Sequence, residues 1–87
     1  MKITKQKLEL KIPEGKSPIS IQHEIRENLE RMGVGGLTID IRYDIRSNVA
    51  LVGFNFNGKN YEMKVNNQKD VRANLYAISK RVEYKAR

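Results

Sequence analysis

The segment Leu37–Arg46 constrains the fold of this chain more than any other part of its sequence. Apolar and polar residues alternate through it without a break, and the apolar positions are Leu37, Ile39, Ile41, Tyr43 and Ile45. Successive residues of a β-strand point to opposite sides, so a two-residue period gathers all apolar side chains on one face. The segment therefore predicts an amphipathic strand with one buried and one solvent-facing side.

Two further strands are predicted directly after this one. Apolar residues recur at every second position in Val49–Phe56 and again in Lys59–Val65. The dipeptide Asn57-Gly58 between them is the one preferred in two-residue type I′ hairpin turns. The two segments therefore predict a β-hairpin.

The register of the three strands follows from their turns. With Ser47-Asn48 as a second two-residue turn, the expected cross-strand pairs are Ile41–Phe54, Phe54–Tyr61, Tyr43–Val52 and Val52–Met63, with Ile45, Ala50 and Val65 in line below. Every inward position is then apolar, and a slip of one residue would turn the whole set toward water. The pattern predicts a three-stranded antiparallel meander with one apolar face.

One helix is predicted before the meander in the sequence and another after it. Ser17 followed by Pro18 is typical of a helix N-cap and first helical position, and Gly33 is typical of a helix end. The apolar stripe of this first helix is Ile21, Ile25, Leu29 and Met32. Asn66 or Asn67 is expected to cap the second helix. Its apolar stripe is Val71, Leu75, Ile78 and Val82.

A further strand is predicted before the first helix, from Lys7 to Ile12, where charged and apolar residues alternate as far as Pro13. The element order is then β-α-β-β-β-α. Both helices need an apolar surface to cover, and the meander offers one. We expect a single α+β domain over residues 1–87, a two-layer sandwich with the meander, an edge strand and two helices on one face. The pattern leaves open which edge of the sheet the first strand joins.

The composition limits what such a domain can do. The 87 residues include 17 Lys and Arg, 10 Asp and Glu and no Cys, which gives a formal net charge of +7. A chain of this size holds one core and hardly a deep substrate cleft, and it has no thiolate nucleophile. Residues 1–12 lack the apolar core of a signal peptide, and the longest apolar run, Val49–Val52, is too short to span a bilayer. We expect a cytoplasmic, non-enzymatic binding protein without a membrane partner, small-molecule substrate, cofactor or metal.

A basic pattern in the second helix is the most informative polar feature. Its members, spaced three, four and four apart, are Lys69, Arg72, Tyr76 and Lys80. This spacing puts them on one stripe roughly opposite the apolar stripe. Lys and Arg can neutralise phosphates, and an exposed tyrosine can stack on an unpaired base. The stripe predicts contact with a DNA or RNA backbone. The alternative is a solvated helix face on which Tyr76 lies flat against its neighbours.

Three other patterns have a structural and a functional interpretation. His23 and Glu27 are spaced as two metal ligands could be, but two ligands without a third make no site, so we expect a solvated histidine. The glycine-rich stretch 33–36 follows a helix and precedes a strand, the reverse of a phosphate-binding loop, which favours a cap and a turn. Val49 and Leu51 fall on the outer sheet face beside Arg46, Lys64 and Asn66. They predict either a protein-partner surface or a patch covered by the first strand or the N-terminus.

The order of elements over residues 18–85 resembles the double-stranded RNA-binding domain. Lys69 and Arg72 match two of the basic positions that open the second helix of that family, and Gln68 stands where another lysine is expected. The Gly-Pro-His loop and the Gly-x-Gly before the second helix do not occur in this sequence. The resemblance implies phosphate contacts from the second helix, with a smaller footprint than that of the complete motif.

Residues 43–87 also resemble the small module that precedes a J domain in some bacterial and mobile-element proteins. The motifs that carry this resemblance are Val52-Gly53-Phe54, Gly58-Lys59-x-Tyr61 and Asp70-Val71-Arg72-x-Asn74-Leu75-x-Ala77-Ile78. It implies a protein-interaction or adaptor module beside a cochaperone domain, without enzymatic activity. The His-Pro-Asp motif of a J domain does not occur in this chain.

Overall fold

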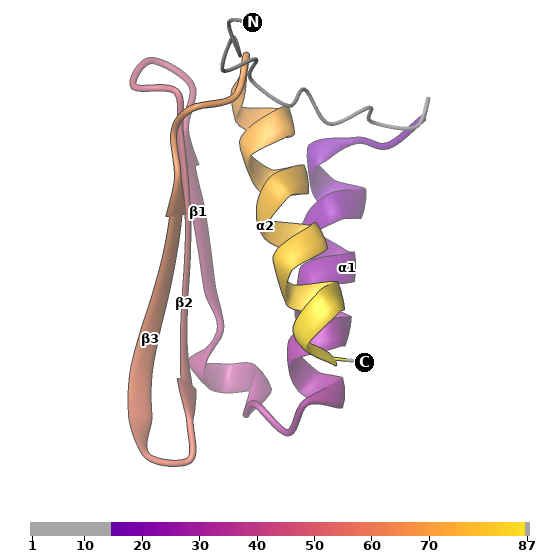
Figure 1. Cartoon of the computed structure of the whole chain (residues 1–87), viewed down its shortest axis with the longest axis vertical. Helices are drawn as coiled ribbons and strands as arrows, with labels where there is room; N and C mark the ends of the chain where they lie inside the picture. The colour runs from indigo at the N-terminus through magenta and orange to yellow at the C-terminus, as the bar shows by residue number, and fades with distance from the viewer. Residues whose placement is uncertain (1–14, 87) are drawn as a thin grey trace, which may run out of the picture.

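The computed structural model describes residues 15–86, which form an antiparallel sheet with two helices on one side of it (Figure 1). The elements are α1 (Pro18–Arg31), the 3₁₀ helix η1 (Gly36–Thr38), β1 (Asp40–Asp44), β2 (Val49–Phe56), β3 (Lys59–Val65) and α2 (Val71–Ala86). The α+β class and the order α-β-β-β-α confirm the expectation from the sequence. The strand predicted at Lys7–Ile12 lies outside the described residues.

Local signals set both ends of α1 as predicted. The Ser17 hydroxyl accepts a hydrogen bond from the Ser20 N–H at 3.1 Å, and Pro18 occupies the first helical position. Gly33 has φ +101°, and the Val34 N–H donates to the Leu29 carbonyl at 3.0 Å. This arrangement is a Schellman ending, which needs a left-handed residue at the glycine position.

The hairpin of β2 and β3 has the predicted register. Phe54 lies opposite Tyr61 with the two rings stacked at 5.5 Å between centroids, and Val52 lies opposite Met63. Asn57 and Gly58 both have positive φ, 54° and 80°, as a type I′ turn requires.

The predicted register of β1 against β2 is wrong by two residues. Ile41 pairs with Val52 instead of Phe54, and Tyr43 pairs with Ala50 instead of Val52. The cause is Asp44, whose Oδ1 accepts the N–H groups of Arg46 at 2.9 Å and Ser47 at 3.4 Å. Such side-chain bonds favour a wider turn, so the loop spans residues 45–48 instead of Ser47-Asn48 alone. A two-residue shift preserves the alternation of faces, and the predicted inward side of β2 is therefore correct.

Strand β1 is shorter than the alternation predicts. Leu37 belongs to η1 and is fully exposed, and Ile45 lies in the loop after β1 with 75% of its surface exposed. Thr38 ends the ladder, because its hydroxyl donates to the Gly35 carbonyl at 2.7 Å and accepts the Asn55 N–H at 3.2 Å. A side chain thus takes the place of the next backbone pairing.

Helix α2 packs against the sheet on one side and against α1 on another (Figure 1). All residues from Ala73 to Ser79 are therefore buried, and Leu75, Ile78 and Val82 are completely inaccessible. The helix begins at Val71 instead of after Asn66 or Asn67, because the Asp70 carboxylate caps it by accepting the Ala73 N–H at 2.8 Å. Within the described residues, no helix has the length and apolar character needed to cross a membrane.

Candidate functional site

A buried asparagine joins two loops at one end of the sandwich. Asn74, on α2, is fully buried, and its Nδ2 donates to the carbonyl oxygen and to Oδ1 of Asn48, both at 3.0 Å. Its Oδ1 accepts the Gln68 N–H at 3.0 Å. Asn48 Nδ2 in turn donates to the Gln68 carbonyl at 2.8 Å. These bonds hold the loop between β1 and β2 against the segment between β3 and α2.

The two joined loops carry basic side chains, which together with the end of β3 form a surface that we call the loop end. Its defining residues are Arg46 in the first loop, Lys69 in the second and Lys64 near the end of β3. All three are exposed, and within residues 15–86 none of their side chains makes an ion pair or a hydrogen bond. The nearby carboxylates of Asp44 and Asp70 accept hydrogen bonds from backbone N–H groups of the loop and of α2. The cations at this end therefore lack acidic partners.

The direction of the helices adds to the positive potential of the loop end. Both α1 and α2 begin at this end of the molecule (Figure 1). Neither helix has an acidic residue in its first turn. Because the N-terminus of a helix carries a partial positive charge, the dipole of α1 reinforces the charge of the basic side chains, whereas the Asp70 carboxylate that caps α2 offsets the dipole of that helix.

The four residues predicted to form a stripe on α2 do not lie together on a solvent-facing surface. Tyr76 is only 7% exposed and belongs to the hydrophobic core, so its expected exposure is wrong. The reason is that α2 is covered on two sides. Arg72 is half-buried, and its Nη1 donates to the Lys16 carbonyl at 2.8 Å. Lys69 is exposed and precedes the helix.

Lys80 lies further along α2 and has partners of its own. Its ammonium donates to Glu83 at 3.2 Å and lies 5.2 Å from the centre of the Tyr76 ring. The hydrogen bond to Glu83 raises the pKa of Lys80 above its ordinary value. Of the four residues, the structure thus leaves Lys69 at the loop end, places Arg72 in the first turn of α2 with its guanidinium bonded to Lys16, and separates Tyr76 and Lys80 from the loop end. Sequence reasoning placed Arg46 beside Val49 and Leu51 and missed its grouping with Lys69, which depends on the hydrogen bonds of Asn74.

The second surface predicted from the sequence, Val49 and Leu51, lies on the outer sheet face and is not covered by a described element. Val49 and Leu51 alternate with the buried residues of β2 and are half-buried on the side away from the helices. Leu51 lies between Arg42 and Lys64 in the register of the three strands. Among the described elements, none covers this face, since both helices pack on the other side (Figure 1).

The structure gives ordinary structural roles to the other residues that the sequence singled out, namely His23, Glu27 and the glycine-rich stretch 33–36. His23 and Glu27 are both exposed on α1, and residues 15–86 contain no group of three or more His, Asp or Glu side chains placed to hold a metal. In the glycine-rich stretch, Gly33 ends α1 and Gly35 precedes η1, which confirms the cap and turn interpretation.

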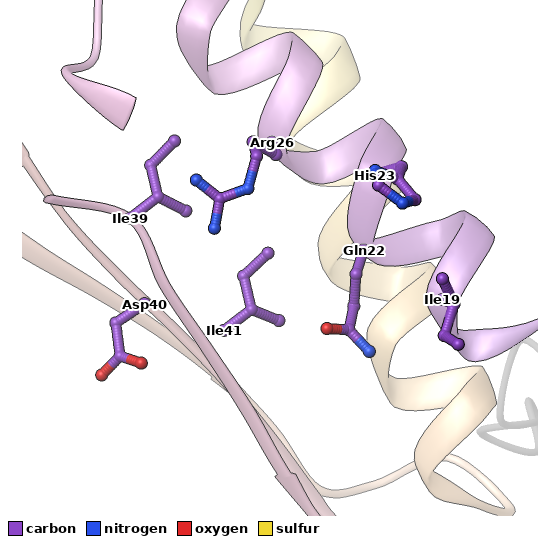
Figure 2. Close-up of a pocket in the computed structure, with 7 residues that line it drawn as sticks. All are labelled: Ile19, Gln22, His23, Arg26, Ile39, Asp40 and Ile41. Atoms are coloured by element: carbon purple, nitrogen blue, oxygen red, sulfur yellow. The ribbon is translucent and has the colours of Figure 1, made fainter. Parts of the chain in front are cut away.

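A hollow of about 270 Å³ between α1 and β1 was not foreseen from the sequence. Figure 2 shows Gln22, His23 and Arg26 of α1 on one side of it and Ile39 and Ile41 on the other. It exists because α1 packs on α2 instead of directly on the sheet.

No protein-family model, curated protein or solved structure matches this chain. The resemblances to the RNA-binding domain and to the J-domain-associated module therefore depend on the sequence motifs alone.

Proposed function

We propose that this protein is a non-enzymatic cytoplasmic binding module that contacts a nucleic-acid backbone through the loop end. The observation that carries the proposal is that Arg46, Lys64 and Lys69 lack acidic partners among the described residues and lie on segments joined by Asn74. Each such cation can neutralise a phosphate and release its condensed counterions, which is the main source of sequence-independent affinity.

The hydrogen bonds of Asn74 support this function because they fix the loops before a ligand arrives. A surface that is already ordered loses less conformational entropy on binding than a flexible one. Because Tyr76 is buried, the proposed contacts do not include stacking of its ring on a base. Phosphate contacts orient a protein on a nucleic acid without selecting a sequence, so we expect little sequence preference.

The test compares two charge-matched double variants in titrations with short labelled DNA and RNA at low salt. Arg46→Gln/Lys69→Gln removes two charges from the loop end, and Lys59→Gln/Lys85→Gln removes two from the opposite end of the molecule (Figure 1). We expect the first variant to lose most of the affinity and the second to bind nearly as the wild type. Equal losses would show that only net charge matters, and a wild-type protein that forms no complex would exclude the function.

A second candidate is a protein-interaction or adaptor module, as the resemblance to the J-domain-associated module implies. The observation that favours it is the half-buried pair Val49 and Leu51, which lies uncovered between Arg42 and Lys64 on the outer sheet face. Leu51→Ser would weaken such a complex and leave nucleic-acid binding unchanged. A complex held by this apolar pair would also depend little on salt, whereas a phosphate contact depends on it strongly.

A further inference from the structure

Strand β3 lies at one edge of the sheet, and its far side has no partner strand among the described residues. The sheet order is β1-β2-β3, and α2 covers only the inner face of β3 (Figure 1). Residues Lys59–Glu62 and Lys64 are exposed along this seven-residue strand, and neither a proline nor a bulge interrupts it. An unpaired edge of this kind presents backbone N–H and C=O groups to an extended segment that fits it.

The hairpin turn determines which backbone groups of β3 face the open edge. A two-residue turn is closed by hydrogen bonds between its flanking residues, which here are Phe56 and Lys59. Hydrogen-bonded and non-hydrogen-bonded pairs alternate along an antiparallel ladder, so Met63 directs its backbone groups toward β2. The N–H and C=O groups of Glu62 and Lys64 therefore point outward, away from the sheet.

Glu62 and Lys64 also carry charges that no described residue neutralises. Both side chains are exposed on the outer sheet face, and within residues 15–86 neither makes an ion pair or a hydrogen bond. On the inner face, Tyr61 is 45% exposed and Met63 is half-buried, beside a hollow of about 350 Å³. The edge thus combines free backbone groups, unpaired charges and partly covered apolar side chains.

We propose that β3 pairs with β3 of a second copy of this protein, antiparallel and with the two Met63 residues beside each other at a two-fold axis. In this register Glu62 lies beside Lys64 of the second copy, and Lys64 lies beside Glu62 of the second copy. On the inner face, Tyr61 lies beside Val65 of the second copy. The two sheets then form one continuous sheet with the helices of both copies on the same side.

Charge complementarity selects this register. Both ion pairs that the axis relates are attractive, and opposite charges directly across neighbouring strands stabilise a sheet. A register centred on Glu62 would place two carboxylates side by side, and one centred on Lys64 would do the same with two ammonium groups. The outward N–H and C=O groups of Glu62 meet those of Lys64 in the second copy, so the backbone and the charges specify the same pairing.

The edge of β1 offers a poorer match to a second copy. It is five residues long, and Arg42 already pairs with Asp40 of the same strand at 2.9 Å. The Asp44 carboxylate accepts backbone N–H groups of the loop that follows. Strand β1 therefore has no free pair of opposite charges to exchange with a second copy.

The proposal goes beyond the proposed function and requires no nucleic acid. Lys64 belongs to both surfaces, so its pair with Glu62 of a second copy and its contact with a phosphate exclude each other. Arg46 and Lys69 lie outside the strand pairing. A short ladder buries little surface, so we expect a reversible dimer at high protein concentration and a monomer at the low concentrations of a binding titration.

The first experiment measures the oligomeric state of the full-length chain by sedimentation equilibrium, up to millimolar protein concentration. The wild type should shift from monomer to dimer as the concentration rises. Glu62→Lys and Lys64→Glu should each raise the dissociation constant of the dimer about tenfold or more, because each places like charges side by side on both sides of the axis. Glu27→Lys is the control, since it makes the same change of charge at an exposed position of α1.

An equimolar mixture of the two single variants gives the sharpest outcome. Each variant alone opposes like charges, but in a mixed dimer both pairs become attractive again. The mixture should therefore associate about as tightly as the wild type, and so should the double variant Glu62→Lys/Lys64→Glu. A wild type that stays monomeric, single variants that dimerise like the wild type, or a mixture that does not associate would each overturn the proposal.

The register is accessible to a separate measurement because the chain contains no cysteine. Met63→Cys places two cysteines in a non-hydrogen-bonded pair with Cα atoms about 4.5 Å apart, a distance that a disulfide can span. Asn60→Cys is the control, because in this register its two cysteines lie roughly 20 Å apart. After circular dichroism has shown that both variants fold, mild oxidation at high concentration should give a disulfide-linked dimer of Met63→Cys alone. Equal cross-linking of the two variants, or none in Met63→Cys, would contradict the pairing.

Discussion

Asn74 Nδ2 lies 3.0 Å from both the carbonyl oxygen and the side-chain Oδ1 of Asn48, which precedes it by 26 residues in the chain. The relationship explains why an asparagine occupies each position. Asn48 has φ +50°, a left-handed conformation that asparagine adopts more readily than most residues. Asn74 is a completely buried side chain of α2 that has both donor and acceptor groups, and its bonds order the two loops that carry Arg46 and Lys69.

Asn74→Ala should lower the free energy of unfolding by about 1–3 kcal/mol, because it leaves buried groups of Gln68 and Asn48 without partners. Urea denaturation measures the loss. Asn67→Ala is the control, since Asn67 is exposed and its side chain bonds only that of Gln68, at 3.4 Å. The effects of Asn48→Ala and Asn74→Ala should combine to less than their sum, because both remove the same bonds. Additive effects would show that the two side chains act independently.

Tyr76→Ala should destabilise the fold by roughly 3 kcal/mol or more, as expected for a buried aromatic side chain. Tyr76→Phe keeps the ring and should unfold close to the wild-type midpoint. The affinity of Tyr76→Phe for single strands and for duplexes should equal that of the wild type, because the cations of the loop end are unchanged. A loss of affinity in Tyr76→Phe would show that the tyrosine hydroxyl takes part in binding.

Phe54→Ala should cost roughly 3–5 kcal/mol, since Phe54 is buried and stacked on Tyr61. The matched variant is Asn55→Ala, on the opposite face of the same strand, whose side chain bonds only Asn60 near the surface. Its effect should stay within about 0.5 kcal/mol, as for most surface positions. The two urea midpoints decide whether the inner face of β2 is assigned correctly.

The parts of the fold that depend on neighbouring residues could be predicted from the sequence. Asn57-Gly58 specifies a turn, and the Ser17-Pro18 pair specifies a helix start, whatever lies elsewhere in the chain. The register of β1 against β2 depended instead on Asp44, whose side chain could have closed either a short or a long turn. The carboxylate bonds to Arg46 and Ser47 resolve this choice only in the folded loop.

The candidate site was less predictable, because it depends on contacts between distant segments. A helical wheel assigns one buried face, but α2 has two, since α1 lies on the side that was expected to face solvent. Tyr76 is buried for this reason. The nearest sequence signal for the loop end was Asn74, a polar residue inside an otherwise apolar stretch of helix. Its partner Asn48 could be identified only from the three-dimensional structure.

Gly33→Ala should lower the free energy of unfolding by about 1–2 kcal/mol, because a residue with a Cβ is strained at φ +101°. Space is not the cause, since the nearest atom to such a Cβ would be in Phe56 at 3.8 Å. Gly35→Ala is the control, because its φ of −65° suits any residue and its Cβ would also meet an atom at 3.8 Å. Equal thermal midpoints for the two variants would contradict the left-handed ending of α1.

The salt dependence of nucleic-acid affinity should report the three unpaired cations of the loop end, Arg46, Lys64 and Lys69. Three phosphate contacts give a slope of log affinity against log salt of about −2.7 on B-DNA and about −2.1 on single strands. Arg46→Gln/Lys69→Gln should reduce the slope on B-DNA by about 1.8, since each lost contact removes about 0.9. Lys59→Gln/Lys85→Gln should leave it unchanged. A slope that stays the same in the loop-end variant would mean that the phosphates are bound by other residues, and binding that does not depend on salt would favour the protein-interaction module.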